Sequence, residues 1–176
     1  MVDLVTEAGI DGATVLEIGG GVGEIQLELL ERGAASATGL ELSPAYDADA
    51  ERLLAEKGLT GRVQRRLLDL AAEPTAVEPA DVVVLHRVVC CYPDYARLLS
   101  AAAGRTRRQL VFSHPPRNLV SRTLVGSQNL LLRLSGSEFR AFTHPPAAML
   151  AVLAEHGLAV RATGGGRVWR VVALTR

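Results

Sequence analysis

A glycine-rich turn is the group of residues whose spacing most directly suggests chemistry. Residues 17–23 read Glu-Ile-Gly-Gly-Gly-Val-Gly, between a short apolar run and a helix-like pattern. Glycine permits positive φ and lets a ligand lie against bare backbone at a helix N-terminus. A dinucleotide-binding turn has the spacing Gly-x-Gly-x-x-Gly. When this spacing is counted from Gly19, the position of the last glycine is occupied by Glu24, so the chain lacks that motif. The chain instead has the spacing Gly-x-Gly-x-Gly, preceded by the carboxylate of Glu17, which suits a partly cationic ligand. The alternative is a tight turn between strand and helix that uses the same glycines and binds no ligand.

Three histidines and a pair of cysteines are the other candidates for chemistry. His86 ends a predicted buried strand, and His114 and His144 each precede a Pro-Pro pair. An imidazole at the carboxyl end of a strand can act as a general base in an open α/β sheet, whereas a histidine before proline is also a common loop cap. Cys90 and Cys91 are adjacent, a spacing that rarely allows an ordinary disulfide and matches no standard metal-ligand set. We therefore expect no metal, and we expect both thiols to be small buried filler.

The elements that must position these residues alternate between strands and helices. The pattern predicts strands over 13–18, 35–41, 62–68, 81–86 and 109–113, and helices over 22–32, 44–56 and 92–103. Strands separated by helices imply right-handed crossovers and a mainly parallel sheet covered on both faces. Two further strand-like runs, 158–163 and 168–174, are joined by three glycines and Arg167 and predict a hairpin, which adds an antiparallel strand. The expected fold class is therefore α/β.

With these features the chain resembles the S-adenosylmethionine-dependent methyltransferases of the Rossmann-like class. Their first motif, acidic-x-Gly-x-Gly-x-Gly, is complete here as Glu17, Gly19, Gly21 and Gly23. The resemblance runs from about residue 13 to residue 176 and implies one methyltransferase domain over 1–176. It implies a three-layer Rossmann-like sandwich, with a seven-stranded, mostly parallel sheet and an antiparallel C-terminal hairpin strand. Relatives usually carry one or two helices ahead of the first strand, and about twelve residues precede Ala13 here, which implies a more open cofactor site or a removed segment.

The resemblance implies S-adenosylmethionine as the cofactor and assigns its contacts by position. Glu41 closes the second strand, eighteen residues beyond Gly23, where the family's carboxylate accepts both ribose hydroxyls, a task that suits two oxygens. Asp69 follows the third strand, where the family holds the adenine amino group. The other implied cofactor contacts are Glu17, Gly19, Gly20, Gly21, Gly23, Leu42, Leu70 and His86. An exposed strand-end carboxylate at Glu41 and a turn or N-cap role for Asp69 are the structural alternatives.

Catalysis of methyl transfer requires the acceptor to lie in line with the methyl group, and a hydroxyl acceptor also needs a base. His86 is the first candidate for that base because the family places the end of the fourth strand beside the methyl donor. His114 and His144 are the other candidate catalytic residues. Arg87 and Tyr92, which follow His86, are expected to contact the substrate.

The acceptor is expected to lie against residues 117–157, where small-molecule relatives build their acceptor pocket. Within this segment, 118–135 has the apolar spacing of an amphipathic helix, which could pack on the core or form a lid over an apolar or anionic acceptor. Enzymes of this class that methylate bases or glutamine typically carry Asn or Asp followed by Pro-Pro and Tyr or Phe after the fourth strand. This chain has His86-Arg-Val-Val there, and only 4% of its residues are aromatic, so we expect no nucleic-acid partner.

Composition and charge set the remaining limits. The chain has 176 residues, 48% of them hydrophobic, which fits one ordinary domain with its own core. Residues 1–58 hold twelve acidic and three basic side chains, a net charge of −9, and residues 59–176 hold seven acidic and sixteen basic, a net charge of +9. The basic half could face an anionic substrate or could be ordinary solvated surface. No apolar run is long enough for a membrane span and no signal peptide is evident, so we expect a cytoplasmic location.

These observations predict an S-adenosylmethionine-dependent methyltransferase that acts on a small organic acceptor, with O-methylation favoured. The alternative is a non-catalytic or truncated S-adenosylmethionine-binding domain that acts as a partner protein. A nicotinamide oxidoreductase is a third possibility, which fails on the glycine spacing and needs a catalytic domain that the length hardly allows. Prosthetic-group and quinone methyltransferases, the magnesium-protoporphyrin type among them, offer the nearest general resemblance.

Overall fold

A computed structural model describes residues 1–137, 139–166 and 168–176, and its centre is a sheet of seven strands. The strands are β1 (Thr14–Ile18), β2 (Ser36–Glu41), β3 (Val63–Leu67), β4 (Ala80–Leu85), β5 (Thr106–His114), β6 (Ala159–Gly165) and β7 (Arg170–Thr175). Their order in the sheet is β3-β2-β1-β4-β5-β7-β6, with β1 to β5 parallel and β7 antiparallel to both β5 and β6. This topology confirms the predicted sheet, and Arg167 of the predicted hairpin turn lies outside the described residues.

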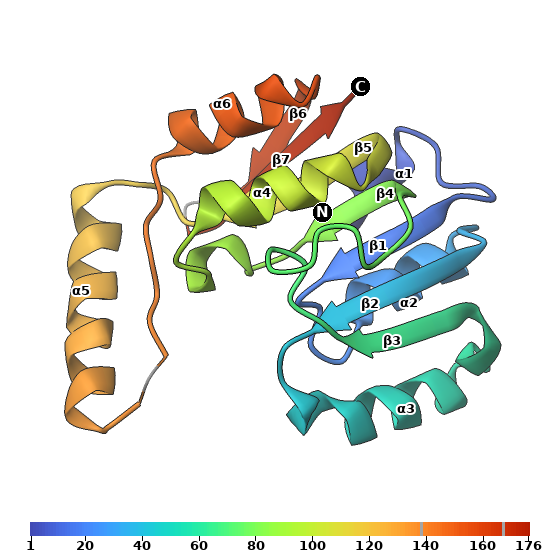
Figure 1. Cartoon of the computed structure of the whole chain (residues 1–176), viewed down its shortest axis with the longest axis horizontal. Coiled ribbons are helices and arrows are strands. Elements are labelled where there is room, and N and C mark those ends of the chain that lie inside the picture. Colours follow the sequence, from blue (N-terminus) through green and yellow to red (C-terminus); the bar gives the residue numbers. More distant parts are fainter. Residues whose placement is uncertain (138, 167) are drawn as a thin grey trace.

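Helices cover the sheet on both faces. They are α1 (Val2–Thr6), α2 (Glu24–Glu31), α3 (Asp47–Glu56), α4 (Tyr95–Gly104), α5 (Leu119–Leu134) and α6 (Pro146–Glu155), with short 3-10 turns η1 (Pro44–Tyr46), η2 (Thr60–Arg62) and η3 (Val89–Cys91). Helices α4 and α6 pack on one face and α1 and α2 on the other, while α3 flanks β3 (Figure 1). The three-layer sandwich expected from the sequence is therefore confirmed.

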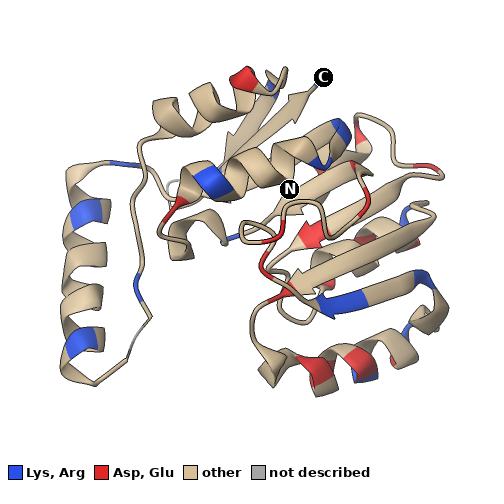
Figure 2. Cartoon of the chain, viewed as in Figure 1, with Lys and Arg blue, Asp and Glu red and all other residues tan. Residues whose placement is uncertain are grey.

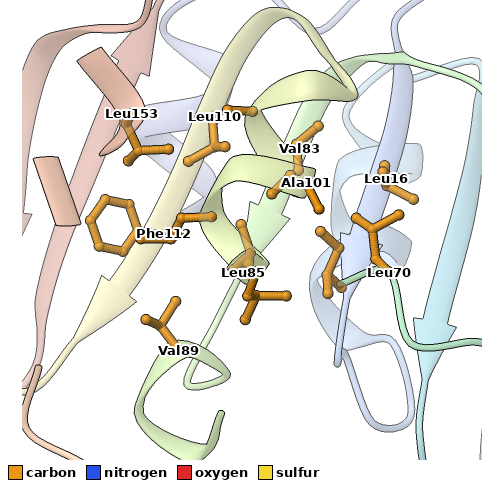
Figure 3. Close-up of a cluster of buried hydrophobic side chains, with 14 of the residues drawn as sticks. Leu16, Leu70, Val83, Leu85, Val89, Ala101, Leu110, Phe112 and Leu153 are labelled. Atoms are coloured by element: carbon orange, nitrogen blue, oxygen red, sulfur yellow. The ribbon is translucent and has the colours of Figure 1, made fainter. Parts of the chain in front are cut away.

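The core is two apolar clusters, one on each face of the sheet. Strand β4 alternates between them, because Val83 and Leu85 join the cluster under α4 and α6 while Val82 and Val84 join the cluster under α1 and α2. Burial on both faces explains why this strand is a continuous apolar run. Figure 3 shows Leu85 and other strand residues of the first cluster packed together with Ala101 of α4 and Leu153 of α6. This packing fixes the carboxyl ends of β1, β2, β4 and β5 at one edge of the sheet, where ligands bind in open α/β folds.

The arginines of the basic second half act largely as caps for backbone carbonyl groups. Arg66 donates to the carbonyl of Ala76 at 2.6 Å, and Arg176 donates to that of Ala103 at 3.0 Å. Acidic side chains gather on α3 (Figure 2), where Arg52 lies 3.0 Å from both Asp49 and Glu56. Many of these charged side chains therefore bond to groups of the same chain and stabilise its fold.

The helices differ from the sequence prediction in three ways. The helix predicted from residue 92 begins at Tyr95, because η3 precedes it and Asp94 caps it by accepting the backbone N–H of Arg97 at 3.0 Å. Helices α1 and α6 were not predicted. Helix α5 forms where the amphipathic pattern predicts, but none of its residues is buried and it stands away from the sheet (Figure 1), so the structure contradicts the first of the two alternatives, packing on the core. No helix in the described ranges is long and apolar enough to cross a bilayer.

Candidate functional site

The glycine-rich turn joins β1 to α2 and depends on positive φ angles. Gly19, Gly21 and Gly23 have φ of +64°, +60° and +88°, and Gly23 is the left-handed N-cap of α2. At Gly19 a Cβ atom would also lie 2.6 Å from Cγ2 of Val88, so the loop after β4 approaches the bare backbone. Side chains at these positions would therefore strain the turn and displace the neighbouring loop.

The motif carboxylate of Glu17 lies beneath this turn. Its side chain is buried, Oε2 accepts the backbone N–H of Gln26 at 3.2 Å, and a Cβ atom on Gly20 would lie 2.4 Å from its carboxyl carbon. Burial raises the pKa of Glu17 from 4.5 to about 8. Glu17, Gly20 and Gly23 support the turn and do not line the adjacent cavity, whereas Gly19 and Gly21 do.

A cavity of about 400 Å³ lies beside the turn, at the carboxyl ends of β1, β2 and β4. Glu41 at the end of β2 lines it, and its Oε2 accepts the N–H of Gly21 at 2.9 Å. Oε1 accepts the N–H groups of Leu42 and Ser43 at 2.8 and 3.2 Å. About three of the four acceptor positions of this carboxylate are thus occupied, so a diol would bind Oε2 directly and share Oε1 with a backbone donor.

Asp69 and Leu70 line another part of this first cavity, just after β3. Oδ1 of Asp69 accepts the N–H of Ala71 at 2.9 Å, which is the turn role that the sequence left open, and Oδ2 accepts the hydroxyl of Tyr92 at 2.9 Å. Both oxygens keep a free acceptor position, so a ligand amino group can still bind here. Leu42 and Leu70 supply apolar wall, Leu42 with 60% of its surface exposed.

A second cavity of about 340 Å³ adjoins the first and shares Arg87, Cys91 and Phe139 with it. Its other walls come from one side of α5, including Leu124 and Val125, from the segment after α5, and from Trp169 just before β7. The lining is mostly apolar and aromatic. The two cavities together could hold one nucleoside-sized molecule and one small apolar molecule side by side.

Arg87 is the cation at the junction of the two cavities. Its φ of +60° makes it the one non-glycine residue with positive φ among the residues that the structure describes, and strained backbone of this kind is concentrated at functional sites. Its backbone N–H donates to Oγ of Ser113 at 2.8 Å, and its guanidinium carbon lies 5.2 Å from the centre of the Trp169 ring. The hydrogen bond to Ser113 holds the strained backbone, and the cation–π contact with Trp169 positions the guanidinium charge.

The structure places none of the three candidate histidines on either cavity. Nδ1 of His86 lies 3.1 Å from Oγ of Ser113, and burial lowers the pKa of His86. His114 is buried, stacks on Phe112 and donates from Nδ1 to the carbonyl of Pro115 at 2.9 Å. Each imidazole therefore has a local structural role.

His144 holds the loop that carries Tyr92. Its Nε2 donates to the carbonyl of Tyr92 at 2.9 Å, and its ring packs near those of Tyr95 and Phe142, with centroid separations of 4.6 and 5.4 Å. Burial lowers the pKa of His144. This histidine therefore positions Tyr92, which lines the first cavity and not the second.

The two cysteines occupy different surroundings. Cys90 is buried, as expected, but Cys91 is exposed and lines both cavities, so the expectation of buried filler is wrong for Cys91. Their Sγ atoms lie 3.5 Å apart. Across the described ranges, no three His, Cys, Asp or Glu side chains are grouped so that they could hold a metal ion.

Sequence reasoning missed several residues of the cavity walls. Tyr46 and Val88 line the first cavity, Trp169 and Phe142 line the second, and Phe139 lines both. The available signal for Phe139 and Phe142 was that two aromatic residues stand between the predicted amphipathic helix and the predicted hairpin. Trp169 was assigned to a strand, and only the pairing of β7 with β5 brings it to the site.

A protein-family model described as "Methyltransferase domain" matches residues 15–109. This range runs from β1 into β5 and includes the glycine turn, Glu41, Asp69 and Arg87. The match covers more than half of the chain. No curated protein shows significant similarity to it.

Solved structures match the rest of the chain as well. Magnesium protoporphyrin IX methyltransferase of Synechocystis PCC 6803, solved with bound SAH, is 24% identical, with 99% of this chain and 81% of that chain covered and a TM-score of 0.76. An O-methyltransferase family protein of Burkholderia thailandensis is 24% identical over 100% of this chain and 55% of its own, with a TM-score of 0.80. Mitomycin 7-O-methyltransferase is 25% identical over 99% and 52%, with a TM-score of 0.73. The chain spans about half the length of the last two proteins, and these likenesses show the fold.

Proposed function

The chain belongs to the methyltransferase domain family, and we propose that it transfers the methyl group of S-adenosylmethionine to an anionic oxygen of a small, largely apolar acceptor. The observation that carries this proposal is the pair of adjoining cavities with Arg87 at their junction. The first cavity fits the cofactor and the second fits the acceptor. The predicted cytoplasmic location stays a prediction.

The residues around the first cavity fit S-adenosylmethionine. The positive φ of Gly19 and Gly21 opens the backbone beside the cavity, Glu41 offers carboxylate oxygens to a ribose diol, and Asp69 offers them to an adenine amino group. Leu42 and Leu70 supply apolar surface for the adenine ring. When bound, S-adenosylmethionine supplies an electrophilic methyl group, so the chain itself must bind, orient and exclude water.

The second cavity favours an acceptor that arrives already ionised. No histidine, aspartate or glutamate among the described residues lines it, and Arg87 is its one lining cation in that part of the chain. A carboxylate needs no base before it accepts a methyl group, and a guanidinium binds a carboxylate with paired hydrogen bonds. Arg87 would hold such an oxygen at the junction, while Leu124, Phe142 and Trp169 contact the apolar part. The expected product is a methyl ester.

Helix α5 and the segment after it complete this cavity, in line with the expectation that residues 117–157 hold the acceptor. Asn129 of α5 exchanges two hydrogen bonds with the backbone of Ala141, at 2.8 and 2.9 Å, and so fixes the helix to the wall. Helix α6, within the same range, packs Met149 and Leu153 into the core instead. We therefore propose residues 118–142 as the acceptor-binding part.

Two titrations test the proposal in sequence. Calorimetry with S-adenosylmethionine, S-adenosylhomocysteine and NADH should show binding of the first two in the micromolar range and none of NADH. Then 1-naphthoic acid and the uncharged 1-naphthamide are compared through the fluorescence of Trp169, the single tryptophan of the chain. The acid should bind about tenfold more tightly, and the preference should vanish in Arg87→Gln and persist in Arg97→Gln, an arginine that does not line the second cavity.

Methyl turnover distinguishes the enzyme from the alternative of a non-catalytic binding domain. Radioactive S-adenosylmethionine and a panel of aromatic acids should give labelled, base-labile esters. Cofactor binding without any transfer to acids, phenols or amines would favour the non-catalytic domain. Equal binding of the acid and the amide by the parent chain would contradict the proposal of an anionic acceptor. It would not affect the assignment of the cofactor.

A further inference from the structure

The adjacent thiols of Cys90 and Cys91 lie where the two cavities meet, and the proposed methyl transfer does not use them. Both belong to η3, and their Sγ atoms are 3.5 Å apart, in van der Waals contact. Cys91 lines both cavities and Cys90 lines the second. A small reagent that enters either cavity can therefore reach Cys91 with Cys90 directly behind it.

We propose that this pair is a thiol modification site at which Cys91 attacks a small organic disulfide and Cys90 then closes a disulfide to Cys91. In the first step the Cys91 thiolate displaces one thiolate from the reagent and forms a mixed disulfide. In the second step Cys90 attacks Sγ of Cys91, the second reagent thiolate leaves, and the Cys90 proton passes to it. Two protein thiols are oxidised and one reagent disulfide is reduced to two thiols.

The surroundings of the sulfur atoms assign these two roles. Either thiol can donate in the Sγ–Sγ contact, and a hydrogen bond from Cys90 lowers the pKa of Cys91 to about 7 while the pKa of Cys90 is raised above its usual range. The thiolate is the attacking form in thiol–disulfide exchange, and reactive cysteines are accessible to the reagent. Cys91 is exposed and lines both cavities, so a reagent in either cavity can reach its sulfur. Cys90 is buried and keeps its proton until the mixed disulfide forms.

Closing a ring between neighbouring residues must twist the peptide that joins them, and here both groups of that peptide are bonded. The Cys90 carbonyl accepts the N–H of Phe142 at 2.7 Å, and the Cys91 N–H donates to the carbonyl of Val88 at 2.8 Å. Phe142 lines the second cavity and Val88 the first. Oxidation therefore changes both cavity walls, and the strained disulfide will be easily reduced, as is typical of regulatory disulfides.

The experiment uses the full chain and 5,5′-dithiobis(2-nitrobenzoic acid), because Cys90 and Cys91 are its only cysteines. We expect two coloured thiolates per chain, the first released at a rate proportional to reagent concentration and the second at a rate independent of it. The product should be monomeric and lighter than the reduced chain by two hydrogen atoms. Oxidised glutathione should give the same product more slowly.

Two variants separate the roles of the thiols. Cys90→Ala should release one coloured thiolate and keep the other half of the reagent attached, whereas Cys91→Ser should react at least about tenfold more slowly because its remaining thiol is buried. Circular dichroism checks that each variant is folded, and Cys90→Ser replaces Cys90→Ala if the alanine variant is not. A stable mixed disulfide on the parent chain, a disulfide-linked dimer or equal rates for the two variants would overturn the proposal.

The effect of Cys90–Cys91 oxidation on the cavity walls can be measured separately. Oxidation should shift the fluorescence of Trp169 and weaken S-adenosylhomocysteine binding by at least about fivefold, and dithiothreitol should reverse both effects. Cys91→Ser treated in the same way should show neither. An oxidised parent chain with unchanged fluorescence and unchanged affinity would contradict the coupling between the disulfide and the cavities.

Discussion

The hydroxyl of Tyr92 donates a hydrogen bond to Oδ2 of Asp69, with 2.9 Å between the two oxygens. Tyr92 follows η3 and Asp69 follows β3, so the bond joins two loops at the same edge of the sheet. The Tyr92 carbonyl is held in turn by Nε2 of His144 at 2.9 Å. The part of the first cavity wall that Tyr92 forms is thus tied to Asp69, at the proposed adenine site, before any ligand binds.

This link predicts different effects for Tyr92→Phe and Asp69→Ala. Loss of the phenol should lower the free energy of unfolding by about 1 kcal/mol and weaken S-adenosylhomocysteine binding by only about threefold, because Asp69 keeps its bond from Ala71. Asp69→Ala removes the acceptor itself and should weaken binding at least about tenfold. Calorimetry measures the affinities and urea unfolding the stability. Unchanged affinity in Asp69→Ala would remove Asp69 from the cofactor site.

Glu41→Ala should weaken S-adenosylhomocysteine binding by about tenfold or more without unfolding the domain. The substitution removes the proposed ribose acceptor and also the bond from Oε2 to the N–H of Gly21, which helps to hold the turn. Calorimetry measures the affinity, and Glu155→Ala, an exposed carboxylate on α6, is the control for the charge change. Parent-like binding by Glu41→Ala would mean that the second strand does not hold the ribose.

The sheet and its turn could be predicted because their signals are local. Val82 to Leu85 is apolar throughout because β4 is buried on both faces, and the glycine spacing after β1 has few structural solutions. Glu41 and Asp69 could be placed for the same reason, since each lies directly at the end of a predicted strand. Parallel strands bring such residues to one edge of the sheet whatever the details of the helices.

The walls of the second cavity could not be predicted because they depend on which elements lie side by side. The pattern of α5 identifies an apolar side but not what it contacts, and Leu130, Leu131 and Leu134 are exposed in the structure. Helix α6 is apolar nearly all round, so it has no polar stripe to mark it as a helix. Trp169 reaches the site only through the long-range pairing of β7 with β5.

His86→Ala should leave the methylation of a carboxylic acid acceptor within about twofold of the parent rate. The Ser113 hydroxyl accepts the N–H of Arg87, so its own proton can be donated to Nδ1 of His86, and Nε2 then keeps its proton and offers no lone pair. A carboxylate acceptor also needs no base. Labelled-methyl assays measure the rate, with His86→Gln as the variant that keeps a polar group near Ser113. A loss of tenfold or more in both variants would place His86 in the mechanism.

Glu17→Gln should stabilise the domain by an amount that grows with pH. The pKa of Glu17 rises from 4.5 to about 8 on folding because the carboxyl group is buried. Between these values the unfolded chain releases the proton while the folded chain keeps it, so the parent loses stability as pH rises and reaches a constant penalty above about pH 8. Glutamine is uncharged at every pH, and its side-chain oxygen can still accept the N–H of Gln26.

The difference in free energy of unfolding between the variant and the parent should be near zero at pH 4 and should reach a few kcal/mol, on the order of the pKa change, at pH 8. Urea unfolding at several pH values measures it, with Glu155→Gln, an exposed carboxylate on α6, as the control. A difference that does not change with pH would show that Glu17 is ionised in the folded chain, with its charge balanced inside the turn.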